Sequence, residues 1–260
     1  TYRLVLRKDY SDGFRKNLFS GKLNTSKKDE STFRLKLDWD AGDKTLLKFL
    51  ITQIDLDDPA DIWTIDGSLN TLSDRPGMDS QKTNAYGIKV FHQFDGFKFQ
   101  SFTSVTNTDV VLSYDADWGN SDSHMPYIYD YFSETLRNRD TFSQELRFVS
   151  DSADFSSQNM TEWVVGLSFL DIKEENLKKD DGIYGDPSDP DSPYVSQSSS
   201  SSKFSSDNIS IYANIDYLLN ESTKISFGAR WEDYESKYSG SFNENFNPSD
   251  RMSGGKISLS

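Results

Sequence analysis

Hydrophobic and polar residues alternate one by one along much of the chain, most clearly at residues 33–40. One set of alternate positions there is apolar, and the other set is charged. The apolar set is Phe33, Leu35, Leu37 and Trp39, and the charged set is Arg34, Lys36, Asp38 and Asp40. A helix would scatter these residues around its circumference, whereas a strand places each set on one face. The pattern therefore predicts β-strands with one apolar and one polar face.

The same period of two recurs along the chain and predicts ten strands and almost no helix. The predicted strands cover residues 1–10, 31–40, 45–56, 84–94, 97–108, 141–150, 161–173, 208–218, 223–237 and 253–260. Most have about 10 residues or more, whereas strands of soluble proteins usually have about 5–6. A tilted strand that crosses a membrane needs about 9–11 residues. We therefore expect an all-β protein whose antiparallel strands form a segment of a transmembrane β-barrel.

The connections between these strands alternate between short and long. The short ones are residues 41–44, 95–96, 151–160 and 219–222, and the long ones are 11–30, 57–83, 109–140, 174–207 and 238–252. Asp95-Gly96 between two aromatic-rich strands is a strong hairpin signal. Outer-membrane barrels have short periplasmic turns and long extracellular loops. All five long connections fall at alternate junctions, so the pattern places them on one side, the extracellular side.

Composition narrows the class further. Hydrophobic residues make up 35% of the chain and aromatic residues 14%, which suits strands with one lipid-facing side and aromatic girdles at the membrane interfaces. The net charge of −14 argues against a nucleic-acid partner. Without cysteine, the chain has no disulfide framework and no thiolate metal site. No run approaches 18 apolar residues, so no transmembrane helix is expected.

Several stretches resemble the barrel strands of TonB-dependent outer-membrane receptors. Residues 143–147 read Ser-Gln-Glu-Leu-Arg and lead into a strand with Trp163 and Gly166, as one hairpin of that family does. Further similar stretches, in the family's order, are 12–17, 34–39, 210–217 and 223–231. The resemblance spans nearly the whole chain. It implies a location in the bacterial outer membrane and a barrel of about 22 strands with a plugged lumen.

The family resemblance also implies a function and partners. Receptors of this family take up a scarce nutrient in an energised step driven through TonB. A ferric siderophore is our first expectation, with cobalamin or an oligosaccharide as alternatives. Membrane lipid and lipopolysaccharide are the expected surroundings. We see neither a plug domain with a TonB box nor a closing strand with a terminal aromatic residue, so we expect residues 1–260 to be one part of the barrel domain.

Aromatic residues in the predicted extracellular loops are the candidate ligand-binding residues. They offer a large contact area at low entropic cost for stacking on a siderophore or sugar. The candidates are Trp63, Trp118, Tyr127, Tyr129, Tyr131, Tyr184 and Tyr194. The competing interpretation is that they pack loop against loop or belong to the outer aromatic girdle.

Histidines and acidic clusters are weaker candidates. We expect His92 to be structural on an apolar strand face, and His124 to be a solvated loop residue. Acidic clusters at 55–58 and 180–191 could bind calcium, but the EF-hand pattern is absent and a solvated acidic loop is the favoured interpretation. We therefore predict neither a metal site nor a cofactor.

Charged residues on the polar strand faces should point into the lumen, where they pair, face water or contact a plug. They include Arg34, Lys36, Glu145, Arg147, Arg230 and Glu232. Motifs of serine hydrolases, zinc proteases and P-loop enzymes are absent, so no enzymatic activity is expected. Three alternatives remain open: a passive porin-type channel, a soluble or surface β-sandwich that binds carbohydrate or adhesion partners, and an enzyme on a smaller outer-membrane barrel.

Overall fold

The computed structural model describes residues 1–151, 161–220, 223–241 and 245–259. Ten long strands correspond one for one to the ten predicted strands. They are β1 (Tyr2–Ser11), β3 (Lys28–Asp40), β4 (Thr45–Pro59), β6 (Met78–Gln93), β7 (Phe97–Asp115), β8 (Ile128–Ser150), β9 (Thr161–Gly185), β10 (Tyr194–Asn220), β11 (Thr223–Gly240) and β13 (Ser249–Leu259). Three two-residue strands lie in the connections: β2 (Lys16–Asn17), β5 (Asn70–Thr71) and β12 (Asn245–Phe246).

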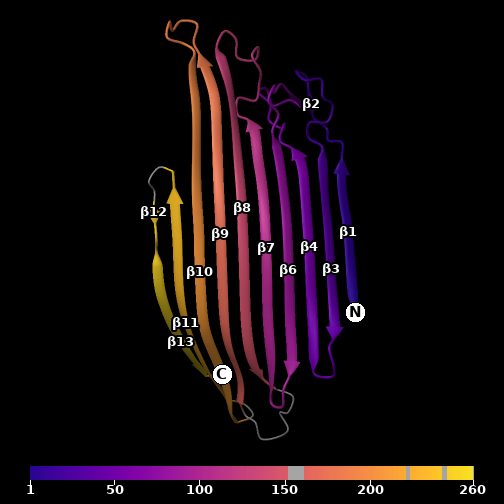
Figure 1. The fold of residues 1–260 in the computed structure, drawn as a ribbon, viewed down its shortest axis with the longest axis vertical. Coiled ribbons are helices and arrows are strands. Elements are labelled where there is room, and N and C mark those ends of the chain that lie inside the picture. The colour runs from indigo at the N-terminus through magenta and orange to yellow at the C-terminus, as the bar shows by residue number, and fades with distance from the viewer. Residues whose placement is uncertain (152–160, 221–222, 242–244, 260) are drawn as a thin grey trace.

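The long strands form one antiparallel sheet in which chain neighbours are also spatial neighbours. The order is β1-β3-β4-β6-β7-β8-β9-β10-β11, and β11 pairs with both β12 and β13 at the far edge. Figure 1 shows β1 and β13 at opposite edges of this wall, with the short turns at one end and the long connections at the other. The predicted separation of short and long connections is thus confirmed for the part of the chain that is described. The predicted turn at 151–160 falls almost wholly outside it.

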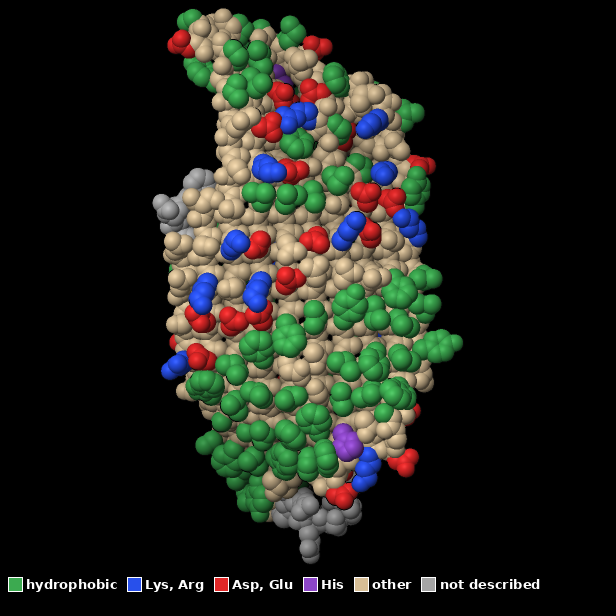
Figure 2. All heavy atoms as spheres, in the orientation of Figure 1, with side chains coloured by type: hydrophobic (Ala, Val, Ile, Leu, Met, Phe, Trp, Pro, Cys, Tyr) green, Lys and Arg blue, Asp and Glu red, His purple; other side chains and the backbone are tan. Residues whose placement is uncertain are grey.

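One face of the sheet carries an apolar band. The strand pairing brings its residues into register, so that Leu167 lies opposite both Leu146 and Ile211, and Ile211 lies opposite Trp231. On β10 the band runs along alternate positions of residues 209–217, about the length that a tilted strand needs to cross a bilayer. Figure 2 shows this outer face, with apolar side chains over its lower part, toward the short turns.

Rows of charged side chains appear among the apolar ones on the upper part of the outer face (Figure 2). One row there contains Lys203 and Glu175, whose Nζ and Oε1 atoms lie 2.7 Å apart, and continues through Asn138, Asp109 and Lys82 to Asp55. Such a row of charged residues cannot face hydrocarbon without a large desolvation cost. The strands therefore extend beyond the hydrophobic layer on the side of the long connections.

This extension corrects the predicted loop boundaries. β9 and β10 are 25 and 27 residues long, and only residues 186–193 connect them, where the sequence predicted a loop over 174–207. The serine run at 198–202 and the acidic residues Asp180 and Asp181 lie on these strands, and the acidic cluster at 55–58 lies on β4. Outside the membrane neither face contacts lipid, so the apolar alternation that reveals a membrane strand disappears there.

Most of the buried side chains lie at the loop end of the sheet, although Ser210 on β10 is also fully buried. Among described residues Ala60 is the one buried hydrophobic side chain, while Asn17, Thr71, Ser73 and Asp115 are all buried polar residues. A wall one sheet thick encloses no apolar core, because its two faces meet lipid and lumen. The described residues also contain no helix with the length and hydropathy needed to span a membrane.

Candidate ligand-binding site

Three tyrosines form a row across adjacent strands near the long connections. Tyr129 on β8 pairs with Tyr184 on β9, and Tyr184 pairs with Tyr194 on β10. Alternate residues of a strand share a face, so this row lies on the same side as Glu145, far along β8, opposite the apolar band. The three side chains are 41%, 37% and 50% exposed. They form an accessible aromatic platform on the lumenal side.

The rings of this platform contact one another and their surroundings. The ring centroids of Tyr129 and Tyr131 lie 4.8 Å apart, and those of Tyr129 and Tyr184 lie 6.4 Å apart in an edge-to-face arrangement. The Tyr131 ring covers Gly182, where a β-carbon would lie 2.2 Å from a ring atom. The Tyr194 hydroxyl donates to Asp189 Oδ2 at 2.7 Å, and this bond holds the pKa of Tyr194 above its usual value. Each of these side chains thus has a ring contact or a hydrogen bond that positions it.

The predicted aromatic candidates divide into two groups. Tyr129, Tyr131, Tyr184 and Tyr194 lie on strands rather than in loops, which corrects their predicted location. The remaining three, Trp63, Trp118 and Tyr127, lie in the connections 60–77 and 116–127 as predicted. The sequence could not place the three tyrosines in one row, because cross-strand register depends on pairing between residues far apart in the chain.

The three loop aromatics are held in different ways. Trp63 packs against Tyr114 with ring centroids 5.3 Å apart. Trp118 has a φ of 61°, an uncommon conformation for a residue other than glycine, and its backbone N–H donates to Asp115 Oδ1 at 3.2 Å. Tyr127 N donates to the His124 carbonyl at 3.0 Å and its side chain is exposed. Only Trp63 thus has an aromatic neighbour that accounts for it by packing among the described residues.

The structure places His92 as predicted from the sequence, but it places His124 differently. His92 lies on the apolar face, with its ring 4.4 Å from that of Phe94 and its Nδ1 2.7 Å from Thr45 Oγ1. His124 is not the solvated residue that we expected. It is packed in the connection 116–127, with its ring 5.2 Å from that of Tyr129 and its Nε2 3.3 Å from the Asp117 carbonyl. Neither histidine joins a metal cluster, since no group of three or more acidic or histidine side chains among the described residues is placed to hold an ion.

Charged side chains on the lumenal face form local networks. Arg147 pairs with Glu145 at 2.8 Å, and Arg230 pairs with Glu232 at 2.8 Å. Tyr212 reaches across β9 and donates to Glu145 Oε1 at 2.6 Å. Gly166 makes this reach possible, because a β-carbon there would lie 2.2 Å from the Tyr212 ring. The predicted lumenal position of these charges is confirmed by strand register, although these ion pairs run along a strand rather than across strands.

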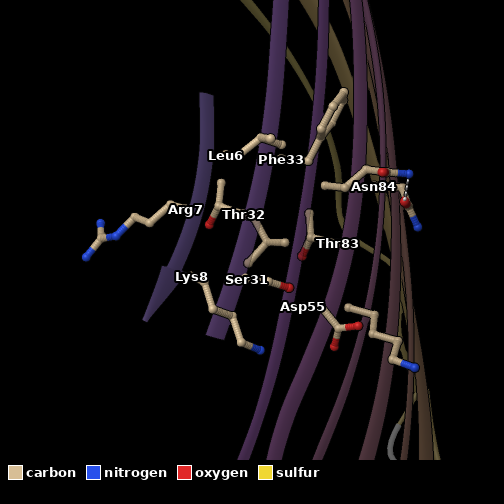
Figure 3. A pocket seen from close by; sticks show the side chains of 12 residues that line it. Leu6, Arg7, Lys8, Ser31, Thr32, Phe33, Asp55, Thr83 and Asn84 are labelled. Atoms are coloured by element: carbon tan, nitrogen blue, oxygen red, sulfur yellow. Dashed lines mark hydrogen bonds between the residues drawn. The ribbon is translucent and has the colours of Figure 1, made fainter. Parts of the chain in front are cut away.

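A groove on the outer face crosses β1, β3, β4 and β6 (Figure 3). Leu6 and Phe33 lie at one end and Lys8 and Asp55 at the other, where the apolar band gives way to charge. The groove opens on the face opposite the tyrosine row. We therefore assign it to the membrane-facing surface and not to the candidate ligand-binding site.

No protein-family model and no curated protein matches the chain. Its structure is similar to that of the ferric yersiniabactin uptake receptor FyuA from Yersinia pestis, with a TM-score of 0.64 at 16% identity over 99% of this chain and 38% of that one. The fold is that of a TonB-dependent receptor barrel.

Two further receptors of this fold give a similar result. BauA, the ferric preacinetobactin receptor from Acinetobacter baumannii, has a TM-score of 0.61 at 13% identity, over 99% of this chain and 40% of that one. The ferric citrate transporter FecA has a TM-score of 0.59 at 14% identity, over 99% and 36%. The chain thus spans well under half the length of these TonB-dependent receptors and covers part of a larger barrel.

Proposed function

We propose that the chain forms part of the barrel wall of an outer-membrane receptor that captures a scarce nutrient for energised, TonB-dependent uptake. A ferric siderophore is the first candidate ligand, with cobalamin or an oligosaccharide as alternatives. The observation that carries the proposal is the tyrosine row of Tyr129, Tyr184 and Tyr194, which faces the lumen above a wall whose other face is apolar. FyuA and BauA are receptors for ferric complexes and FecA is a ferric citrate transporter, which supports the choice of ligand.

Three aromatic residues on one surface can stack on the planar or hydrophobic parts of a ligand at small entropic cost. We propose that Tyr129, Tyr184 and Tyr194 contact the ligand directly, joined by Tyr131 and by the exposed rings of Trp118, Tyr127 and Trp63 from the connections. The remainder of the barrel, a plug domain and a TonB box would come from other parts of the receptor. Lipopolysaccharide is the proposed neighbour of the charged upper part of the outer face.

The proposal is tested by uptake of radioactive iron from a panel of ferric siderophores into cells that produce the full-length protein. We expect uptake of at least one complex, and we expect it to stop when TonB is removed. In Tyr184→Ala, the apparent affinity for the ferric siderophore should fall about 5- to 30-fold. This change is equivalent to about 1–2 kcal/mol, for the loss of one aromatic contact with the bound ligand.

Tyr86→Ala is the matched control. Tyr86 is 47% exposed, but it lies in the apolar band on the outer face, so its removal should leave the apparent affinity unchanged. Uptake that persists without TonB would instead identify a passive porin-type channel. If no siderophore is taken up, the same assay with cobalamin and oligosaccharides decides between the remaining ligands.

A further inference from the structure

Three long connections meet in a buried polar cluster at the loop end of β7. β2 and β5 form a short parallel pair that joins the connection 12–27 to the connection 60–77. Asn17 Nδ2 donates to Asp61 Oδ2 at 2.8 Å and to the Ser73 carbonyl at 2.7 Å. Asn120 Nδ2 then donates to the Leu72 carbonyl at 2.8 Å, which attaches the connection 116–127. The cluster thus ties together segments that the sheet itself does not pair.

Two carboxylates lie at the centre of this cluster. Asp115 and Asp117 are only 4% and 6% exposed. Asp115 Oδ1 accepts the backbone N–H groups of Asp117 and Trp118, each at 3.2 Å. Asp117 Oδ1 accepts the N–H of Gly119 at 2.9 Å, and its Oδ2 accepts the N–H of Tyr131 at 2.7 Å. The pair therefore holds the backbone at both ends of the connection 116–127, including two of the candidate aromatic residues.

One oxygen of this pair is left without a partner. Asp115 Oδ2 and Ser73 Oγ are both buried, and neither makes a well-formed hydrogen bond to another described residue. The Ser73 hydroxyl lies beside the Asp115 carboxyl and lowers its pKa, but by less than burial raises it. An unpartnered, buried carboxylate oxygen beside a second carboxylate carries a large desolvation cost. A proton on Asp115 Oδ2 removes this cost, since the acid is then neutral and can donate to Asp117 or to Ser73.

We propose that Asp115 and Asp117 form a buried proton-binding site that fastens the three connections together when one proton is bound. Burial raises the pKa of Asp115 to about 7, and the charge of Asp117 adds to the rise. The other charged or titratable groups around the pair are Asp61, Asp74 and Arg75 from the connection 60–77, His124 from the connection 116–127, and Asp130 from β8. Arg75 is engaged by Asp130 and Asp181 and is not an ion-pair partner of Asp115.

The sign of the pH dependence follows from the raised pKa. We call the arrangement closed when the three connections are tied together by the cluster, and open when they are not. A carboxyl group that is harder to ionise in the closed arrangement than in the open one favours closure when it is protonated. Closure is therefore strongest at low pH and weakens as the pH rises above the ordinary aspartate value and through about 7. With a pKa for Asp115 of about 7 in the closed arrangement and the ordinary value of 3.8 in the open one, the equilibrium constant for local opening should rise about 30-fold between about pH 5.5 and about pH 8.5.

Hydrogen–deuterium exchange of the full-length protein in detergent tests the proposal, with rates corrected for the intrinsic effect of pH. We expect peptides from 68–76 and 116–127 to be protected at about pH 5.5 and to exchange faster at about pH 8.5. Asp115→Asn mimics the protonated acid and should stay protected at both. Asp122→Asn is the matched control, because Asp122 is an exposed acid on the same connection, and it should retain the wild-type change.

Infrared spectroscopy of the wild type supplies a second readout that does not depend on folding of a variant. A carboxylic-acid band should titrate with a midpoint near pH 7, and Asp115→Asn should lack it. The proposal is overturned if loop protection in the wild type is the same at both pH values, if Asp115→Asn keeps the wild-type change, or if no carboxylic-acid band titrates in this range. None of these outcomes depends on which nutrient the receptor binds.

Discussion

Gly166 and Tyr212 show how a single residue shapes the lumenal wall. They pair across β9 and β10, and the missing side chain of Gly166 gives the Tyr212 ring room to lie across β9 and reach Glu145 on β8. A glycine in a strand normally weakens it, and it is retained where another group approaches closely. The sequence alone could not predict why residue 166 is a glycine, because the tyrosine that occupies the space of the missing side chain lies 46 residues further along the chain.

The close approach at Gly166 makes a stability prediction. In Gly166→Ala, the new methyl group would overlap the Tyr212 ring, so the ring must move and lose its hydrogen bond to Glu145. We expect the free energy of unfolding to fall by about 1–3 kcal/mol. Gly254→Ala is the control, because a β-carbon there meets nothing within 4 Å. Urea unfolding of the protein in detergent measures both, and equal stabilities would contradict this role for Gly166.

Residue identity alone indicated the aromatic candidates but not their arrangement. All seven lie toward the long-connection end, yet Tyr129, Tyr184 and Tyr194 become a platform only through strand register. The polar cluster around Asp115 was missed altogether. Its partners, Ser73 and Asn17 among them, come from separate connections, and polar loop residues give no periodic signal before folding.

The pattern of apolar and polar residues changes along the length of the longest strands. On β10, residues 209–217 alternate between apolar and polar positions, while residues 196–202 are almost all serine. Lipid contact imposes the alternation, so strand prediction succeeds inside the membrane and stops at its boundary. The predicted strand starts at 208, although β10 begins at Tyr194. The ten strands and their ends at the short turns were therefore predicted correctly, whereas the ends of β6 to β10 toward the long connections were not.

This change of character along β10 predicts two unequal effects of the same substitution. Ile211 lies in the apolar band and Ser199 lies on the same face beyond it. Ile211→Lys should lower the stability of the protein folded in lipid by about 2–4 kcal/mol, the cost of lysine near the bilayer midplane, and Ser199→Lys should change it by no more than about 1 kcal/mol. Denaturant unfolding from lipid vesicles measures both. Similar costs at the two positions would contradict the placement of the membrane boundary.

At the scale of the whole molecule, the alternation of short and long connections predicted the architecture. It predicted that all long connections share one end, and the described part of the sheet confirms this (Figure 1). Within the part of the chain that the structure describes, β1 and β13 are the edges of the sheet, and hydrocarbon does not tolerate unpaired backbone groups. Further strands at both edges would close the barrel, in agreement with the share of FyuA and BauA that the chain covers.

We expect one face of the wall to meet lipid and the other to meet an aqueous lumen. The chain contains no cysteine, so single cysteines can carry a spin label at each position from 209 to 217 of β10 in the full-length protein in lipid vesicles. We expect labels at 209, 211, 213, 215 and 217 to collide with a lipid-soluble relaxing agent, and labels at the positions between them to collide with a water-soluble one. Accessibility without this alternation, or no access to the lipid-soluble agent at any position, would contradict this expectation and favour a soluble β-sandwich.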